Sequence, residues 1–186
     1  MLRWTSLFIP LALAACAMAS VEVEGPGRHE IGNAYSISTS QSWTHFETPS
    51  GEFWTIHGAT LGRLRTWANV GGGEPLVEVK DRTMPIFKKG STAVEVAELV
   101  ADTVEALASG ADVEIIGLRP APFGSQAGFR FEIRLIDNGL PLHGVALGSV
   151  ETGALNLILF TAPAEYYFDL YSPEVETILA SVSTRA

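Results

Sequence analysis

Between residues 129 and 135 apolar and charged residues alternate strictly, and this alternation leaves little choice of fold. The apolar positions are Phe129, Phe131, Ile133 and Leu135, and the charged ones are Arg130, Glu132 and Arg134. A period of two is typical of a β-strand with one dry face and one polar face. Residues 137–139 (Asp-Asn-Gly) tolerate the positive φ of a hairpin turn. With returning strands over 145–150 and 155–160, the pattern predicts an antiparallel meander.

Two segments predict helices. Residues 92–95 (Thr-Ala-Val-Glu) match a capping box, in which hydroxyl and carboxylate each satisfy a backbone N–H. Apolar residues then recur at helical spacing as far as Leu107, and Gly110 is a typical stop. A closing helix is predicted to begin with Ser172 as its cap and Pro173 at its first position.

Helices with one apolar face, set beside a meander, favour an α+β domain. A curved antiparallel sheet would be covered by the helices in layers. Residues 52–57 predict a further strand, residues 61–70 predict either another strand or an irregular segment over the core, and the glycines of 71–73 predict a loop. We expect one such domain over residues 35–186.

The N-terminus has the layout of a secretory signal peptide. Arg3 precedes the apolar run 7–12, which ends in Leu13-Ala14-Ala15-Cys16. The run is shorter than the roughly 20 residues that span a bilayer. Its end resembles a bacterial lipobox, which implies removal of residues 1–15 and lipidation of Cys16.

Ordinary signal-peptide cleavage at residues 17–19 (Ala-Met-Ala) is the alternative. Cys16 is the chain's one cysteine, and a lone thiol in an oxidising compartment is a liability that lipidation removes. We therefore favour lipidation. Ala17 after the cysteine favours the outer over the inner membrane by resemblance to Gram-negative lipoproteins. Residues 16–34 lack a clear period and predict a flexible tether.

The composition of the chain excludes some classes of binding partner. The chain carries a formal net charge of −9, which argues against nucleic acid as a partner and against docking on anionic lipid by charge. With no cysteine framework, the domain must be held by an ordinary hydrophobic core, and the chain is long enough to build one.

Two stretches resemble uncharacterised Gram-negative bacterial lipoproteins. They are residues 118–132, from Leu-Arg-Pro-Ala-Pro-Phe-Gly onward, and residues 157–168 before the closing helix. The order of elements also resembles the PsbP-like α/β/α sandwich. The resemblance implies that fold and no particular activity.

We find no catalytic or metal signature. Residues 124–128 place Ser125 one position early for a nucleophile elbow. The histidines show no metal-ligand spacing; they are His29, His45, His57 and His143. We therefore expect that the protein binds no cofactor and is not an enzyme.

One constellation is a candidate ligand site. Trp54 and His57 precede Arg63 and Arg65 closely, which would suit an anion pocket in which arginines bind a carboxylate or phosphate. The competing interpretation, which we favour, is that Trp54 packs in the core while the arginines solubilise an outer face.

Three further features favour structural interpretations. His143 is expected on the polar face of a hairpin, and the aromatic residues of 166–171 are expected to pin the last helix to the sheet. Residues 119–122 (Arg-Pro-Ala-Pro) predict a rigid connector rather than a docking edge.

Three functions follow in order of preference. The first is a non-catalytic, periplasm-facing lipoprotein that is anchored through Cys16 and binds another envelope protein. The second is a small-ligand binder with a pocket between sheet and helix. The third is a hydrolase that uses a histidine–carboxylate pair from distant positions.

Overall fold

The computed structural model describes residues 20–48, 51–108 and 111–185. Within them an open, antiparallel eight-stranded sheet is the main element. Its strands in spatial order are β1 (Ser20–Glu24), β4 (Trp43–Thr48), β5 (Gly51–Thr55), β6 (Arg63–Val70), β10 (Ala154–Pro163), β9 (Leu140–Glu151), β8 (Gln126–Asp137) and β7 (Val113–Phe123). A small sheet contains β11 (Ser183–Thr184), β3 (Tyr35–Thr39) and β2 (Gly27–Ile31).

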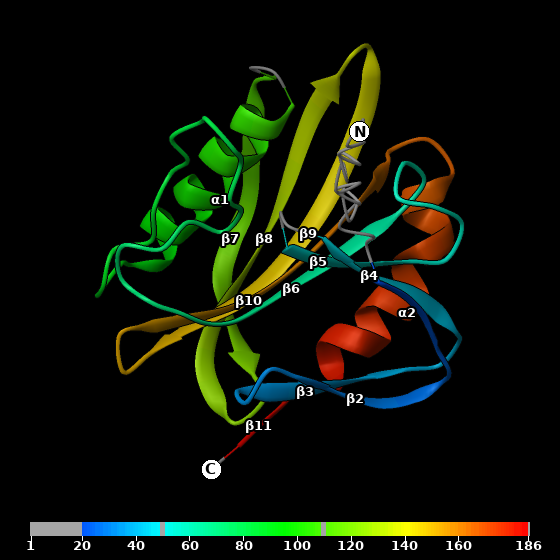
Figure 1. Ribbon diagram of the computed structural model, residues 1–186, viewed down its shortest axis with the longest axis horizontal. Coiled ribbons are helices and arrows are strands. Elements are labelled where there is room, and N and C mark those ends of the chain that lie inside the picture. The colour runs from blue at the N-terminus through cyan, green and yellow to red at the C-terminus, as the bar shows by residue number, and fades with distance from the viewer. Residues whose placement is uncertain (1–19, 49–50, 109–110, 186) are drawn as a thin grey trace, which may run out of the picture.

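Two helices cover opposite faces of the large sheet (Figure 1). Helix α1 (Ala93–Leu107) lies over one face, and α2 (Tyr167–Ala180) lies with the small sheet over the other. Each side has its own hydrophobic core, and β10 contributes to both. Leu157 and Leu159 pack towards α1, while Ile158 and Phe160 pack towards α2. The fold is the predicted α+β layered sandwich.

The sequence patterns located the meander and α1 correctly. β8, β9 and β10 are consecutive antiparallel strands, and Phe131 and Ile133 are fully buried. At the start of α1, the Glu95 backbone N–H donates to Thr92 Oγ1 (3.3 Å). In return, the Thr92 backbone N–H donates to Glu95 Oε2 (2.7 Å). The predicted capping box is therefore confirmed.

The predicted start of the last helix is wrong. Helix α2 begins at Tyr167, with Tyr166 as its N-cap, and Pro173 lies inside the helix. Tyr166 adopts a φ of 72°, which is unusual for a bulky residue. Pro173 is exposed, so its ring and the missing N–H lie on the solvent side of the helix. The aromatic side chains of residues 167, 168 and 171 pack the first turns of α2 against the sheet. This packing stabilises the longer helix more than a cap at Ser172 would stabilise the shorter one.

The prediction of a flexible tether over residues 16–34 is wrong for its central part. β1 pairs with β4, and β2 pairs with β3, so the folded domain reaches back to Ser20. The β1 residues pair with residues 19 to 27 positions further along the chain, from Glu24 with Trp43 to Ser20 with Glu47, which is beyond the reach of a local pattern. β2 and β3 form a local hairpin, which the sequence analysis missed. The predicted signal peptide and Cys16 lie outside the described residues.

Residues 119–122 are not a connector. They belong to β7, the edge strand next to β8, with Pro120 opposite Phe129 and Pro122 opposite Ala127. Proline is tolerated on an edge strand because its missing N–H removes no bond on the outer side. A register shift between Ile116 and Arg119, with Gly117 at a φ of 63°, marks a bulge in the strand.

Candidate functional site

Arg63 and Arg65 point from β6 to the side of the sheet that carries α1. Alternate residues of a strand face one side, so they share this side with Trp67, whereas Leu64 is buried in the α2 core. Both arginines lie over the ring of Phe53 on the neighbouring strand β5. The distances from Cζ to the ring centroid are 5.2 Å for Arg63 and 6.0 Å for Arg65.

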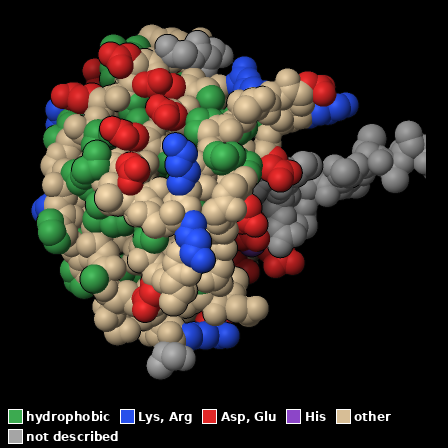
Figure 2. Space-filling view, turned by 90° about the vertical axis from the view of Figure 1, so that its left-hand side faces the viewer, with side chains coloured by type: hydrophobic (Ala, Val, Ile, Leu, Met, Phe, Trp, Pro, Cys, Tyr) green, Lys and Arg blue, Asp and Glu red, His purple; other side chains and the backbone are tan. Residues whose placement is uncertain are grey.

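The two arginines line a cavity between α1 and the sheet, with a volume of about 160 Å³. A dry cavity of about 150 Å³ can hold a molecule the size of benzene. Its apolar wall consists of Trp67, Leu76, Val77, Val100, Val104, Leu107, Ala108, Leu135, Leu142 and Leu159. On the side of the molecule that carries α1, acidic side chains lie among apolar ones (Figure 2).

No described carboxylate neutralises these cations. The ion pairs found in residues 20–48, 51–108 and 111–185 include neither Arg63 nor Arg65. Asp137 also lines the cavity, but it forms no ion pair with either arginine, and one of its oxygens accepts a hydrogen bond from Asn138 Nδ2 (2.9 Å). Within the same described ranges, Arg63 Nε is buried without a hydrogen-bond partner.

Burial perturbs both guanidinium groups. It lowers the pKa of Arg63, and, together with repulsion from Arg63, it lowers the pKa of Arg65 to about 10. Both side chains still carry a positive charge at neutral pH. Two adjacent, partly desolvated cations that form no ion pair with a described residue attract an anion strongly, because little water has to be displaced from them.

The remaining polar groups of the cavity wall are few. The hydroxyl of Thr103 on α1 already donates to the Leu99 carbonyl (2.7 Å). The indole N–H of Trp67 donates to the Leu76 carbonyl (2.6 Å), which fixes the ring in the wall. The site thus combines an apolar interior with cations on one side, an arrangement that fits an amphipathic anion.

The structure brings together only two of the four residues predicted for this site. Trp54 lies opposite Leu64 across β5 and β6 and therefore faces the α2 core, away from the arginines. There its ring stacks on His45 (4.7 Å between centroids) and meets His29 edge-on (5.1 Å). The prediction that Trp54 packs in the core is confirmed. Its grouping with the arginines is wrong because Trp54 pairs with Leu64, and the neighbours of Leu64 in β6, Arg63 and Arg65, face the other side of the sheet.

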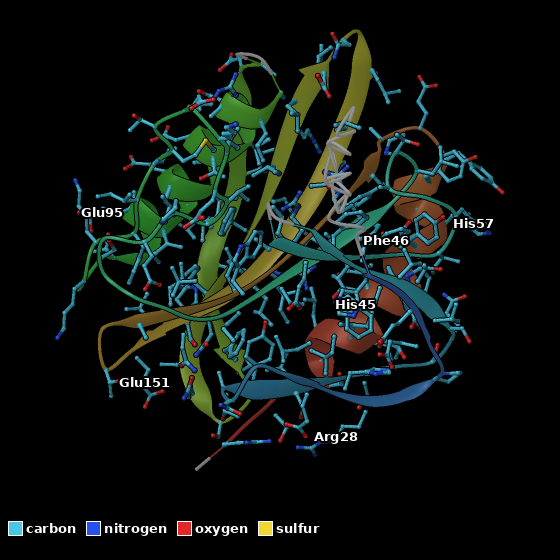
Figure 3. All side chains as sticks on the ribbon, viewed as in Figure 1. Arg28, His45, Phe46, His57, Glu95 and Glu151 are labelled. Atoms are coloured by element: carbon cyan, nitrogen blue, oxygen red, sulfur yellow. The ribbon has the colours of Figure 1, made fainter. Side chains whose placement is uncertain are left out.

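His57 is also separate from the arginines. It follows the end of β5 and is exposed, and its Nδ1 lies within hydrogen-bond distance of the Tyr171 hydroxyl on α2. Figure 3 shows His57 beside α2. The contact joins a loop to the second helix and leaves the cavity under α1 untouched.

Phe168 and Tyr171 have the structural role expected of them, whereas His143 does not lie on an open polar face as predicted: its side chain is only 16% exposed. Tyr171 is buried in the α2 core, and Phe168 packs against it, so both pin α2 to the sheet. His143 stacks on Phe168 (3.8 Å), and its Nε2 lies 2.9 Å from Glu132 Oε2. Tyr166 differs from these residues because its side chain is 69% exposed.

Sequence reasoning missed most of the cavity wall. The alternation Arg63-x-Arg65-x-Trp67 could have indicated that these three side chains share a face. Nothing local indicates that residues 76–77 of a loop and Val104 of α1 meet that face. Within the described ranges, no three His, Cys, Asp or Glu side chains converge as metal ligands would. None of the described helices has the length and apolar character needed to cross a membrane.

The fold is similar to a known one. The solution structure of cyanobacterial PsbP (CyanoP) from Synechocystis sp. PCC 6803 aligns with a TM-score of 0.58. The alignment covers 93% of this chain and 99% of that chain at 15% sequence identity. Comparison with protein-family models and a search of curated proteins found no match. The chain therefore has a PsbP-like α+β fold, and at this identity the likeness extends to the fold alone.

Proposed function

We propose that this protein is a non-catalytic binding protein of the cell envelope that takes a small amphipathic anion in the cavity under α1. The observation that carries the proposal is the pair Arg63 and Arg65, partly buried beside an apolar cavity and without a carboxylate partner among the described residues. A surface arginine would be hydrated or paired. Two unpaired ones held over Phe53 are positioned for a ligand's charge.

The cavity dimensions suggest the ligand class. An anionic headgroup such as a carboxylate would lie on the guanidinium groups, while an apolar group of about six carbons fills the space lined by Leu76, Val104 and Leu142. Charge-assisted hydrogen bonds to arginine are the stronger kind. The apolar wall adds affinity without demanding a unique chemical structure.

The proposed location is the periplasmic side of a membrane, with the outer membrane favoured. Its support is the lipobox-like stretch that ends at Cys16. Two or three acyl chains on that cysteine would give stable anchoring. Intact mass of the protein from envelopes, compared between wild type and Cys16→Ser, tests this part: a lipid increment is expected on the wild type only.

Calorimetric titration with octanoate tests the ligand site. The protein is residues 16–186 with Cys16→Ser, which contain both cores and lack the apolar leader. Octanoate should bind at least about tenfold more tightly than octan-1-ol, which has the same chain and no charge. Arg65→Met should weaken octanoate binding by about tenfold or more, because a hydrogen bond to a charged group contributes about 1.5–3 kcal/mol.

Arg119→Met is the matched control, since Arg119 is an exposed arginine on β7, outside the cavity. It should leave octanoate binding unchanged. Equal binding of octanoate and octan-1-ol, or equal loss in both variants, would contradict the assignment of the arginines.

Binding of another envelope protein is the second candidate function. The observation that favours it is Tyr166, a bulky residue held at a φ of 72° with 69% of its surface exposed. Backbone strain of this kind is concentrated at functional positions. Leu170, one turn later, is also exposed. A pull-down from solubilised envelopes with wild type and Tyr166→Asn tests it, and loss of a stoichiometric partner only in the variant is expected.

A further inference from the structure

On the side of the large sheet that carries α1, the part formed by β1, β4 and β5 has no covering layer among the described residues. We call it the open face: Val21 and Val23 of β1, Phe46 of β4 and Phe53 of β5. The register places Val21 opposite Phe46, and Phe46 opposite Phe53, so these side chains share one side. That side continues onto Arg63 and Arg65 of β6. The core under α1 takes residues from Trp67 onward and none from β1, β4 or β5.

The open face is markedly apolar for a surface. Val21 and Val23 are 56% and 74% exposed, although they are valines in a regular strand. Phe46 and Phe53 stack in parallel, 4.9 Å apart, and are only partly buried. Figure 3 shows Phe46 at the level of β4 and β5, with His45 below these strands towards α2. Adjacent exposed apolar side chains of this kind mark an interaction surface.

The charge of the open face is opposite to that of the chain. The described acids of these strands, Glu22, Glu24 and Glu52, alternate onto the other side of the sheet. There Glu24 and Glu52 lie 3.4 Å from ring nitrogens of His29 and His45. The open face thus combines apolar side chains and two arginines in a chain of net charge −9. The overall acidity argues against docking on lipid by charge, but none of the acidic side chains described for β1, β4 and β5 points to this face.

The proposed anchor would hold this face near the membrane. Cys16 lies four residues before Ser20, where β1 begins. Four fully extended residues span at most about 14 Å, while the headgroup layer on each side of the hydrocarbon core is roughly 5–8 Å thick. A lipid on Cys16 therefore leaves β1 within a short distance of the bilayer surface.

We propose that the open face lies on the bilayer. Val21, Val23 and the phenylalanine pair would enter the headgroup region, and Arg63 and Arg65 would face lipid phosphates beside the cavity. An amphipathic anion that leaves the bilayer would then meet the arginines first. The orientation rests on the anchor and on the ligand site proposed above, but its own test depends on neither.

Vesicle binding tests the face directly. The protein is again residues 16–186 with Cys16→Ser, mixed with phosphatidylcholine–phosphatidylglycerol (3:1) vesicles and sedimented. Val23→Glu should reduce the bound fraction about fivefold to tenfold, since it removes an apolar contact and adds a like charge. Val94→Glu is the control, because Val94 is also an exposed valine (54%) but lies on α1, away from the open face. It should bind vesicles as the unsubstituted protein does.

A label gives a second, independent measurement. Cys16 is the only cysteine, so Val23→Cys in the Cys16→Ser protein has a single thiol for an environment-sensitive fluorophore. Its emission should shift to the blue on adding vesicles, and the same label on Val94→Cys should not shift. Equal behaviour at positions 23 and 94 in either experiment, or no vesicle binding at all, would overturn the orientation. Octanoate affinity, measured on the same Val23→Glu protein, should be unchanged, so a failure of the ligand site would be seen separately.

Discussion

Arg65→Met should stabilise the free protein while it removes the ligand site. Burial and the neighbouring Arg63 lower the pKa of Arg65 well below its ordinary value, to about 10. Each pKa unit corresponds to about 1.4 kcal/mol of interaction that disfavours the charged form, which sets an upper bound of about 3 kcal/mol. The side chain is only partly buried, so solvent screening reduces this cost to about 1.5 kcal/mol.

Methionine keeps most of the aliphatic stem that packs in the cavity wall, and it removes the charge. The contact of the guanidinium with the Phe53 ring is lost, at a cost of about 0.5 kcal/mol. The net expectation is a gain of about 1 kcal/mol in the free energy of unfolding, or about 2–4 °C in Tm for a domain of this size.

Urea unfolding at pH 7, with equal m-values for wild type and variant, measures this difference. Arg119→Met should change the free energy of unfolding by less than about 0.5 kcal/mol. Because the folded-state pKa of Arg65 is depressed, wild-type stability is reduced below that pKa and rises as the pH increases from about 10 towards the higher pKa of the unfolded chain. The advantage of methionine should therefore be constant near neutrality. A loss of 1 kcal/mol or more in Arg65→Met would show that the arginine is a structural element, and the argument for a ligand charge would fail.

Three other substitutions test the scaffold. Glu174→Ala should cost about 3 kcal/mol by urea unfolding, because the buried carboxylate accepts bonds from the backbone and hydroxyl of Ser40 and from Trp43 Nε1; a cost below 1 kcal/mol would contradict this. Gly128→Ala should lower stability by about 2 kcal/mol, since its Cβ would collide with the Gly148 carbonyl, and unchanged thermal unfolding would refute the close approach. The hydrogen bond from Arg130 lowers the pKa of Glu176 in the folded protein. The pair therefore stabilises the fold fully at pH values above the pKa of Glu176 in the unfolded chain, about 4.5, and this stabilisation is lost as the pH falls through the lower pKa of the folded state. Arg130→Gln should thus cost about 0.5 kcal/mol at pH 7 and nothing at pH 2, and an equal cost at both pH values would exclude the ion pair as the cause.

The helical cap and the hairpins were predictable because their signals are local. Thr92 and Glu95 lie within one turn, and the strands β8, β9 and β10 follow one another through tight turns. Alternation within a strand also assigns side chains to faces correctly. It failed for the candidate site only because the grouping of Trp54 with Arg63 and Arg65 used closeness in sequence rather than register.

The start of α2 shows a different limit. Ser172 and Pro173 carry a valid cap signal, worth about 1 kcal/mol, but the helix extends back to Tyr167. Burial of Tyr171 and Phe168 against the sheet contributes more than the cap, because each large side chain removed from water contributes about 2 kcal/mol or more. A local preference is overridden where tertiary packing offers the larger free energy.

The sequence by itself determined the α+β class, the meander, the first helix and the arginine pair on one face of β6. Each of these depends on residues within a few positions of one another. The tertiary structure decided that β1 pairs with β4, that no flexible tether remains over residues 20–31, and that the arginines lie beside a cavity under α1 without a described carboxylate. The β1–β4 pairing and the cavity depend on contacts between segments that lie far apart in the chain, and no local pattern encodes the free energy of those contacts.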